Sequence, residues 1–88
     1  MISRDVTIKN SVGLHARPAT FFIQKANSYK SSIWVGKEDC RVNAKSLLGV
    51  LSLGITKGTV ITLIADGVDE SEAVEGLAEL IDGGFGEK

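Results

Sequence analysis

The sequence contains few of the residues that build metal sites, disulfides and membrane segments. Its 88 residues include one histidine, His15, one cysteine, Cys40, and one proline. A single cysteine cannot close an internal disulfide, and one histidine with one cysteine cannot supply the usual zinc ligand cluster. No apolar run approaches the roughly 18 residues needed to cross a bilayer, and no signal-peptide pattern opens the chain. We therefore expect a reduced cytoplasmic protein with no metal, no cofactor and no membrane insertion.

The composition is that of one globular domain over residues 1–88, but its charge is divided along the chain. Residues 1–57 carry nine Lys and Arg against three acids, a charge of +6, whereas residues 58–88 carry one lysine against eight acids, a charge of −7. This asymmetry fits either a basic face that meets an acidic or phosphate-bearing partner, or two solvated faces without a partner. Direct nucleic-acid binding is disfavoured, because the basic residues are scattered and aromatics are few.

Hydrophobic periodicity predicts seven elements in the order βαββαβα. Their expected ranges are strands 2–8, 32–36, 40–43 and 60–65, and helices 16–27, 46–53 and 69–82. The run at 60–65 is apolar and β-branched and predicts a buried strand. The last helix has Asp69 as its expected cap, a Gly83-Gly84 stop, and an apolar stripe of Ala73, Leu77, Leu80 and Ile81. The fold class is α+β, an open-faced β-sandwich in which three helices cover one face of a four-stranded antiparallel sheet.

The segment Gly13-Leu14-His15-Ala16-Arg17-Pro18 lies where the first turn becomes the first helix. Proline is tolerated there, since the N–H that it lacks has no partner within a helix's first turn. With His15 at the cap position, the amides of Ala16 and Arg17 and the positive helix end would form an anion site beside the imidazole. Arg17 adds a guanidinium suited to phosphate oxygens. A neutral imidazole in this position is a suitable nucleophile toward phosphorus, which leads to the hypothesis of reversible histidine phosphorylation.

The residues alone leave other roles for His15 open. A single histidine at a helix start is more often a surface residue or a cap in a small binding module. Hydrolase-type catalysis is less favoured still, because it needs a base and an orienting group that converge on the nucleophile.

Two motifs resemble those of a known family. Residues 13–19, Gly-Leu-His-Ala-Arg-Pro-Ala, are similar to the phosphorylation-site signature of HPr, the phosphocarrier of the phosphoenolpyruvate-dependent sugar phosphotransferase system. Residues 42–53 resemble the family's second signature at the family's spacing. The resemblance implies an HPr domain that carries a phosphoryl group on Nδ1 of His15, beside Arg17, from enzyme I to enzyme IIA components. Such a protein is a stoichiometric intermediate, not an enzyme, and is expected to be a monomer.

Ser46 is the second candidate site. Its plain role is to cap the second helix, and the resemblance adds that it is the target of an HPr kinase/phosphorylase, whose product acts with the catabolite control protein. A phosphate there would be compatible with the helix dipole. Val50 and Leu53 are expected in the core, whereas an exposed apolar patch for partners is expected at Phe21, Leu47, Leu48 and Leu51.

Three alternatives concern the position of the chain within this family. Val12 departs from the threonine, alanine or asparagine expected before the Gly-Leu-His turn, which removes a polar group from the phosphate's surroundings. A regulatory paralogue has glutamine at the histidine position, and His15 argues against that role. A nitrogen-system paralogue has a similar signature, but the Ser46 segment favours the sugar system or a regulatory variant.

Overall fold

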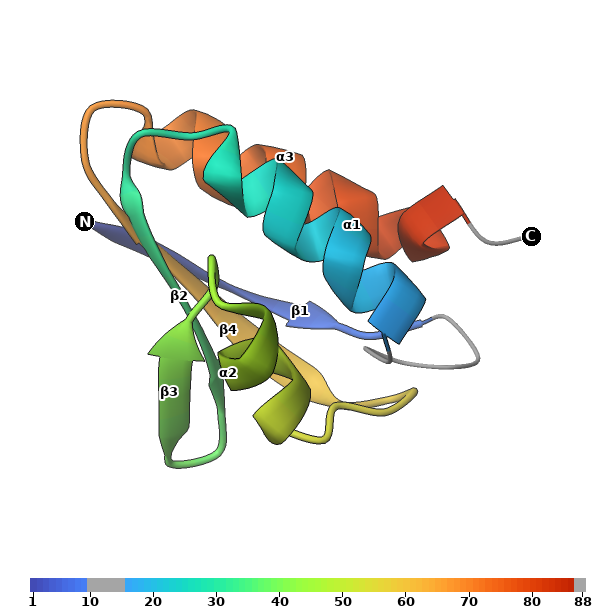
Figure 1. The fold of residues 1–88 in the computed structure, drawn as a ribbon. Helices are drawn as coiled ribbons and strands as arrows, with labels where there is room; N and C mark the ends of the chain where they lie inside the picture. The colour runs from blue at the N-terminus through green and yellow to red at the C-terminus, as the bar shows by residue number, and fades with distance from the viewer. Residues whose placement is uncertain (10–15, 87–88) are drawn as a thin grey trace.

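The computed structural model describes residues 1–9 and 16–86 and has the element order predicted from the sequence (Figure 1). Each predicted helix and strand is present, with bounds within two residues of those expected. The elements are β1 (Ile2–Thr7), α1 (Ala16–Asn27), β2 (Ser32–Lys37), β3 (Cys40–Asn43), α2 (Leu47–Ser52), β4 (Val60–Asp66) and α3 (Glu70–Asp82), followed by a 3₁₀ turn, Gly84–Gly86.

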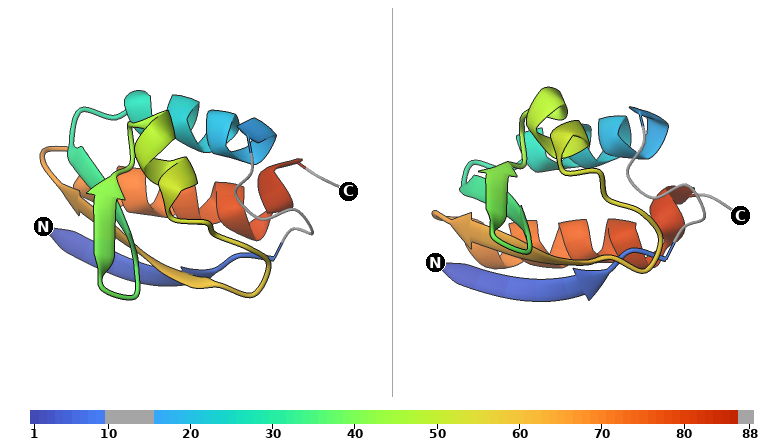
Figure 2. Two further views of the ribbon diagram at one scale, coloured as in Figure 1. Left: turned by 60° about the horizontal axis from the view of Figure 1, so that its bottom comes forward. Right: turned by 90° about the horizontal axis from the view of Figure 1, so that it is seen from below.

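The four strands form one sheet in the order β1-β4-β2-β3, and every neighbouring pair is antiparallel. The helices α1 and α3 lie side by side and α2 lies close to β3 (Figures 1 and 2). The inner face of the sheet and the buried faces of all three helices belong to one hydrophobic core. The expected α+β class, with the helices on one face of the sheet, is confirmed.

The core is formed by alternate strand residues and by one stripe of each helix. Its largest fully buried side chains include Phe22 of α1, Leu77 and Ile81 of α3, and Ile33, Ile61 and Leu63 of the sheet. Each such side chain contributes about 1.5–3 kcal/mol relative to exposure. Val50 and Leu53 are buried as predicted. None of the helices in the described part of the chain is long and apolar enough to span a bilayer.

The expectation that β4 is buried throughout is wrong for half of its residues. Ile61, Leu63 and Ala65 are buried, but Val60 is 55% exposed and Ile64 is half-buried. Successive side chains of a strand point to opposite faces, and only one face of this sheet packs against helices. The β-branched residues on the other face give β4 a sequence pattern that resembles a fully buried strand.

Asp69 precedes α3 as predicted, but its carboxylate does not cap the helix. Its two oxygens accept hydrogen bonds from the backbone amides of Lys30, at 2.8 Å, and Ser31, at 2.9 Å, and from the Ser31 hydroxyl. The loop between α1 and β2 therefore passes beside the start of α3, and its donors, not the amides of α3, bond to the Asp69 carboxylate. These hydrogen bonds hold the pKa of Asp69 at about 2, and the Ser31 hydroxyl makes the largest contribution.

The chain beyond α3 also differs from the simple stop that Gly83-Gly84 predicts. The amide of Gly83 caps the helix by donating to the carbonyl of Glu79 at 2.9 Å. The chain then turns through Gly84, at φ +66°, and returns Phe85 to the core, where it is 5% exposed. The turn at Gly84 therefore lets Phe85 join the hydrophobic core.

Replacing Gly67 with alanine should destabilise the fold. Gly67 has φ +155°, and a Cβ placed on it would lie 2.7 Å from the backbone Cα of Ser31. This contact is far below van der Waals distance and involves backbone that cannot rotate away, so we expect a loss of about 1–3 kcal/mol or more. Urea unfolding of the wild type and of Gly67→Ala measures the loss. Gly58→Ala is the matched control, since φ is also positive there but no atom lies within 4 Å of the added Cβ.

Candidate functional site

The candidate phosphorylation site is described from Ala16 onward, because His15 and Val12 lie outside the described residues. Helix α1 starts at Ala16, so the amides of Ala16 and Arg17 are among the four N–H groups that have no acceptor within the helix. Arg17 is exposed on the first turn, and Pro18 is buried in that same turn, where its missing N–H costs nothing. The start of α1 therefore supplies exposed amides, a positive dipole end and one guanidinium at the residues that follow His15.

Ser46 caps α2, as the sequence predicts. Its backbone is extended, at φ −106° and ψ 114°, and its Oγ accepts a hydrogen bond from the amide of Gly49 at 3.2 Å. A Cβ on Gly49 would lie 3.3 Å from this oxygen, so the absence of a side chain at Gly49 keeps the hydroxyl uncrowded. Ser46 is half-buried. Its hydroxyl is thus positioned by the helix that it caps.

Two lysines that sequence reasoning did not single out hold the ends of the segment that carries Ser46. Lys45 Nζ donates to the carbonyl of Tyr29, just after α1, at 2.8 Å. Lys37 Nζ donates to the carbonyls of Leu53 and Gly54, at the end of α2, at 3.1 and 3.3 Å. Cations near helix C-termini offset the negative end of the dipole. Because these three bonds join residues 16 or 17 apart in the chain, no local pattern could have revealed them.

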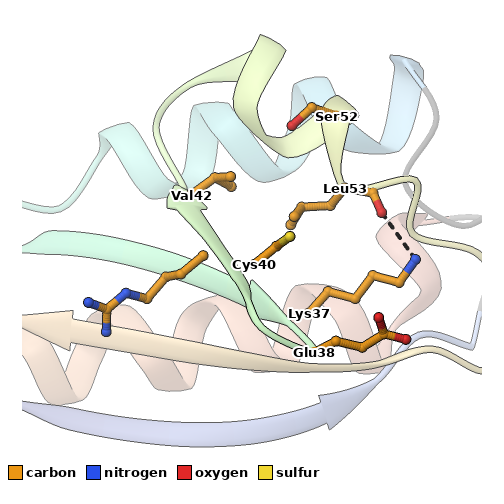
Figure 3. A pocket seen from close by; sticks show the side chains of 7 residues that line it. Lys37, Glu38, Cys40, Val42, Ser52 and Leu53 are labelled. Carbon is orange, nitrogen blue, oxygen red and sulfur yellow. Dashed lines mark hydrogen bonds between the residues drawn. The ribbon is translucent and has the colours of Figure 1, made fainter.

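Lys37 also lines a hollow between β3 and α2 (Figure 3). The hollow has a volume of about 330 Å³, and the exposed thiol of Cys40 lies in it. Of the two cationic residues that line it, Lys37 is already bonded to the carbonyls at the end of α2. We assign this hollow to the packing of α2 on the β2–β3 hairpin. The remaining lining residues are Glu38, Arg41, Val42, Ser52 and Leu53.

The predicted apolar patch is present with one correction. Phe21 of α1 is 45% exposed, and Leu47 and Leu48 of α2 are 40% and 81% exposed. Leu51 was expected in this patch but is only half-exposed and packs against the core. Leu51 follows the fully buried Val50 by one position, about 100° around the helix, and so stands at the edge of the buried face of α2. The helices α1 and α2 that carry these side chains are in contact with each other.

Comparison with known proteins decides the family. The family model described as "PTS HPr component phosphorylation site" matches residues 2–83. The chain belongs to the HPr family. The phosphocarrier protein HPr of Neisseria meningitidis is 49% identical over 99% of this chain and 98% of its own length. The HPr-like protein Crh of Bacillus subtilis is 44% identical over 92% of this chain and 95% of its own length.

Solved structures agree with this assignment. A crystal structure of HPr from Thermoanaerobacter tengcongensis matches with a TM-score of 0.97 and 49% identity, and covers 100% of this chain and 99% of that one. The HPr resemblance and the HPr-like fold are therefore confirmed. A structure of an HPr dimer from the same organism matches with a TM-score of 0.80, 49% identity, and coverage of 99% of this chain and 100% of that one. The expectation that this chain is a monomer stays a prediction.

Proposed function

We propose that this HPr-family protein is a phosphocarrier that accepts a phosphoryl group from phospho-enzyme I on His15 and passes it to sugar-specific enzyme IIA components. The observation that carries the proposal is the match of the family's phosphorylation-site model, combined with a helix that begins at the residue after His15. The whole chain, residues 1–88, would act as one HPr domain in the cytoplasm. It needs no cofactor, because enzyme I supplies the phosphoryl group.

The proposed step is an exchange of one bond for another. The lone pair of the neutral imidazole Nδ1 attacks phosphorus, and the bond between phosphorus and enzyme I breaks as the N–P bond forms. The amides of Ala16 and Arg17 and the Arg17 guanidinium would stabilise the charge on the phosphoryl oxygens. The reverse exchange delivers the group to enzyme IIA. Positioning and charge stabilisation are the main requirements of such a transfer, so a helix start and one arginine suffice.

The proposed docking surface for enzyme I and enzyme IIA combines the apolar patch with nearby positive charge. Phe21, Leu47 and Leu48 supply exposed apolar area, and Arg17 lies on the first turn of α1. An acidic partner would complement the excess of positive charge in residues 1–57. A carrier must release each partner quickly, so we expect a small interface with fast dissociation.

We also propose Ser46 as the regulatory phosphorylation site of an HPr kinase/phosphorylase, with the catabolite control protein as a partner of the modified form. The hydroxyl is half-buried at the N-terminus of α2, and the adjacent Gly49 leaves space around it. A phosphate there would add about −1.5 to −2 charge at neutral pH. That charge would stand on the same helix as Leu47 and Leu48 and would weaken docking to an acidic partner.

Replacing Ser46 with aspartate should therefore slow charging by enzyme I. Aspartate retains N-capping ability, so the helix should persist while a negative charge is added beside the docking surface. We expect the rate of phosphoryl uptake to fall by about tenfold, equivalent to about 1.4 kcal/mol, and the effect to shrink at high salt. Ser46→Asn is the matched control, because it caps similarly without charge. Equal rates for the two variants would contradict the electrostatic argument.

The proposed carrier function is tested by incubating the protein with phosphoenolpyruvate and enzyme I, then measuring intact mass and acid lability. One added phosphoryl group that is stable in alkali and lost in acid supports the proposal. No uptake, where a known HPr charges normally, would refute it.

The alternative is a mainly regulatory role or a role in the nitrogen system. The similarity to Crh proteins, at 44% and 46% identity, favours the regulatory version. Phosphorylation at Ser46 by the kinase without charging by enzyme I would select it.

A further inference from the structure

Helix α2, which is capped by Ser46 and carries the exposed Leu47 and Leu48, is too short to be stable alone. It has six residues, Leu47–Ser52, and isolated helices shorter than about 12–15 residues are marginal in water. Of these six residues, only Val50 is buried. The position of α2 on the fold must therefore depend strongly on contacts made at its two ends.

The N-terminal end of α2 is held on the side of α1. The hydroxyl of Ser46 accepts a hydrogen bond from the amide of Gly49 at 3.2 Å. Lys45 Nζ donates to the carbonyl of Tyr29 at 2.8 Å, which joins this end of α2 to the loop that follows α1. These contacts fix where the helix begins, and they do not reach its other end.

The C-terminal end of α2 is held from the opposite side, by Lys37 of β2. Lys37 Nζ donates to the carbonyls of Leu53 and Gly54, at 3.1 and 3.3 Å. Figure 3 shows the lysine side chain extending from the strand to the end of the helix. The hollow of about 330 Å³ that Lys37 lines lies between β3 and α2. This helix end is therefore joined to the hairpin by a side chain that spans a gap, and not by close packing alone.

The two carbonyls that Lys37 binds belong to the end of the helix, where backbone acceptors lack donors within the helix. The chain turns away at Gly54, at φ +61°, and so leaves both carbonyls open to a donor from outside α2. A single hydrogen bond would let the helix end pivot about it, whereas two bonds to successive carbonyls fix its direction. The ammonium of Lys37 supplies both.

We propose that Lys37 is a positioning residue for partner docking. It fixes the C-terminal end of α2, and through α2 the direction in which Leu47 and Leu48 face. This inference rests on the proposed function, in which those two leucines belong to the docking surface for enzyme I and enzyme IIA. If α2 takes the docking orientation only part of the time, the apparent affinity for a partner falls by that fraction. The transfer step itself is unaffected, because Arg17 and the amides beside it belong to α1.

Amide hydrogen exchange of the full chain tests the tether without any partner. The amides of Leu53 and Gly54 donate to the carbonyls of Val50 and Leu51, each at 3.2 Å, so their exchange reports on opening of this helix end. Lys37→Met keeps an unbranched stem but has no donor, and these two amides should exchange about tenfold faster in it. Amides of α3 should change less. Unchanged exchange at the end of α2, or an equal increase at every amide, would refute the tether.

The kinetics of charging test the positioning role. With enzyme I as the catalyst and this protein as its substrate, Lys37→Met should raise KM at least about threefold and leave kcat unchanged. Lys37→Arg keeps donors at the end of the side chain and should restore most of the wild-type KM. Lys30→Met is the matched control, because it removes the same charge from the exposed loop before β2. An unchanged KM in Lys37→Met, or an equal rise in Lys30→Met, would refute the role.

Failure of this inference can be told apart from failure of the proposed function. If enzyme I did not charge the wild type where a known HPr charges normally, the carrier role would be refuted, and exchange at Leu53 and Gly54 would still decide whether Lys37 holds α2. If the wild type were charged and Lys37→Met showed faster exchange without a change in KM, the carrier role would stand and the positioning role would be refuted.

Discussion

Replacing His15 with alanine should abolish phosphoryl uptake from phosphoenolpyruvate and enzyme I. Under the proposed function, the imidazole is the sole nucleophile, and His15 is the only histidine in the chain. Alanine has no atom that can form the N–P bond, so the expected loss is complete. Intact mass after incubation measures it, and circular dichroism checks that the variant is folded. A variant that still transfers phosphate to enzyme IIA would refute the assignment of His15.

Replacing Arg17 with alanine should slow phosphoryl uptake without preventing it. A charge-assisted hydrogen bond of about 1.5–3 kcal/mol predicts a rate about 10–100-fold lower, with one phosphoryl group still taken up at completion. Lys25→Ala is the control, because Lys25 lies near the far end of the same helix and stacks on Tyr29. If Arg17→Ala charged as fast as the wild type, the helix start alone would account for stabilisation of the phosphoryl group.

Replacing Asp69 with asparagine should lower stability at neutral pH and flatten the acid-unfolding profile. The folded-state pKa of Asp69 is about 2, below the value of 3.8 for an unperturbed aspartate, because the Ser31 hydroxyl and the amides of Lys30 and Ser31 bond to the charged form. A lowered pKa means that this stabilisation is present above about pH 4 and is lost as the pH falls toward 2. Thermal unfolding from pH 7 to pH 2 measures both effects.

The control for this experiment is Asp82→Asn. Asp82 lies at the other end of α3 and is 3.7 Å from Lys9 in a surface ion pair, a kind of contact that adds little to stability. Its variant should therefore keep the wild-type profile. Some acid dependence will remain in Asp69→Asn, because bonds from the Gly67 amide and the N-terminal ammonium also lower the pKa of Glu70. A profile of Asp69→Asn that matches the wild type between pH 4 and pH 2 would contradict the role of the carboxylate.

Local patterns predicted the elements well because a helix or strand face repeats over a few residues. The spacing of Ala19, Phe22 and Ala26 predicted α1, and all three residues are buried. Ser46 was recognised as a cap because a cap acts within three residues. Leu51 and β4 were predicted less well. Sequence shows that a residue is apolar, but its burial depends on whether another element lies over it.

By itself, the sequence determined the order of the elements, the family, and the candidate roles of His15, Arg17 and Ser46, because these depend on short motifs and local periodicity. The tertiary structure alone decided which distant residues meet. In it, the Asp69 carboxylate accepts hydrogen bonds from backbone amides of the loop between α1 and β2, and not from the amides of its own helix. It also joined Lys37 and Lys45 to helix ends, and set the strand order β1-β4-β2-β3. Strand order and register are set by packing of the whole core, and no local pattern encodes them.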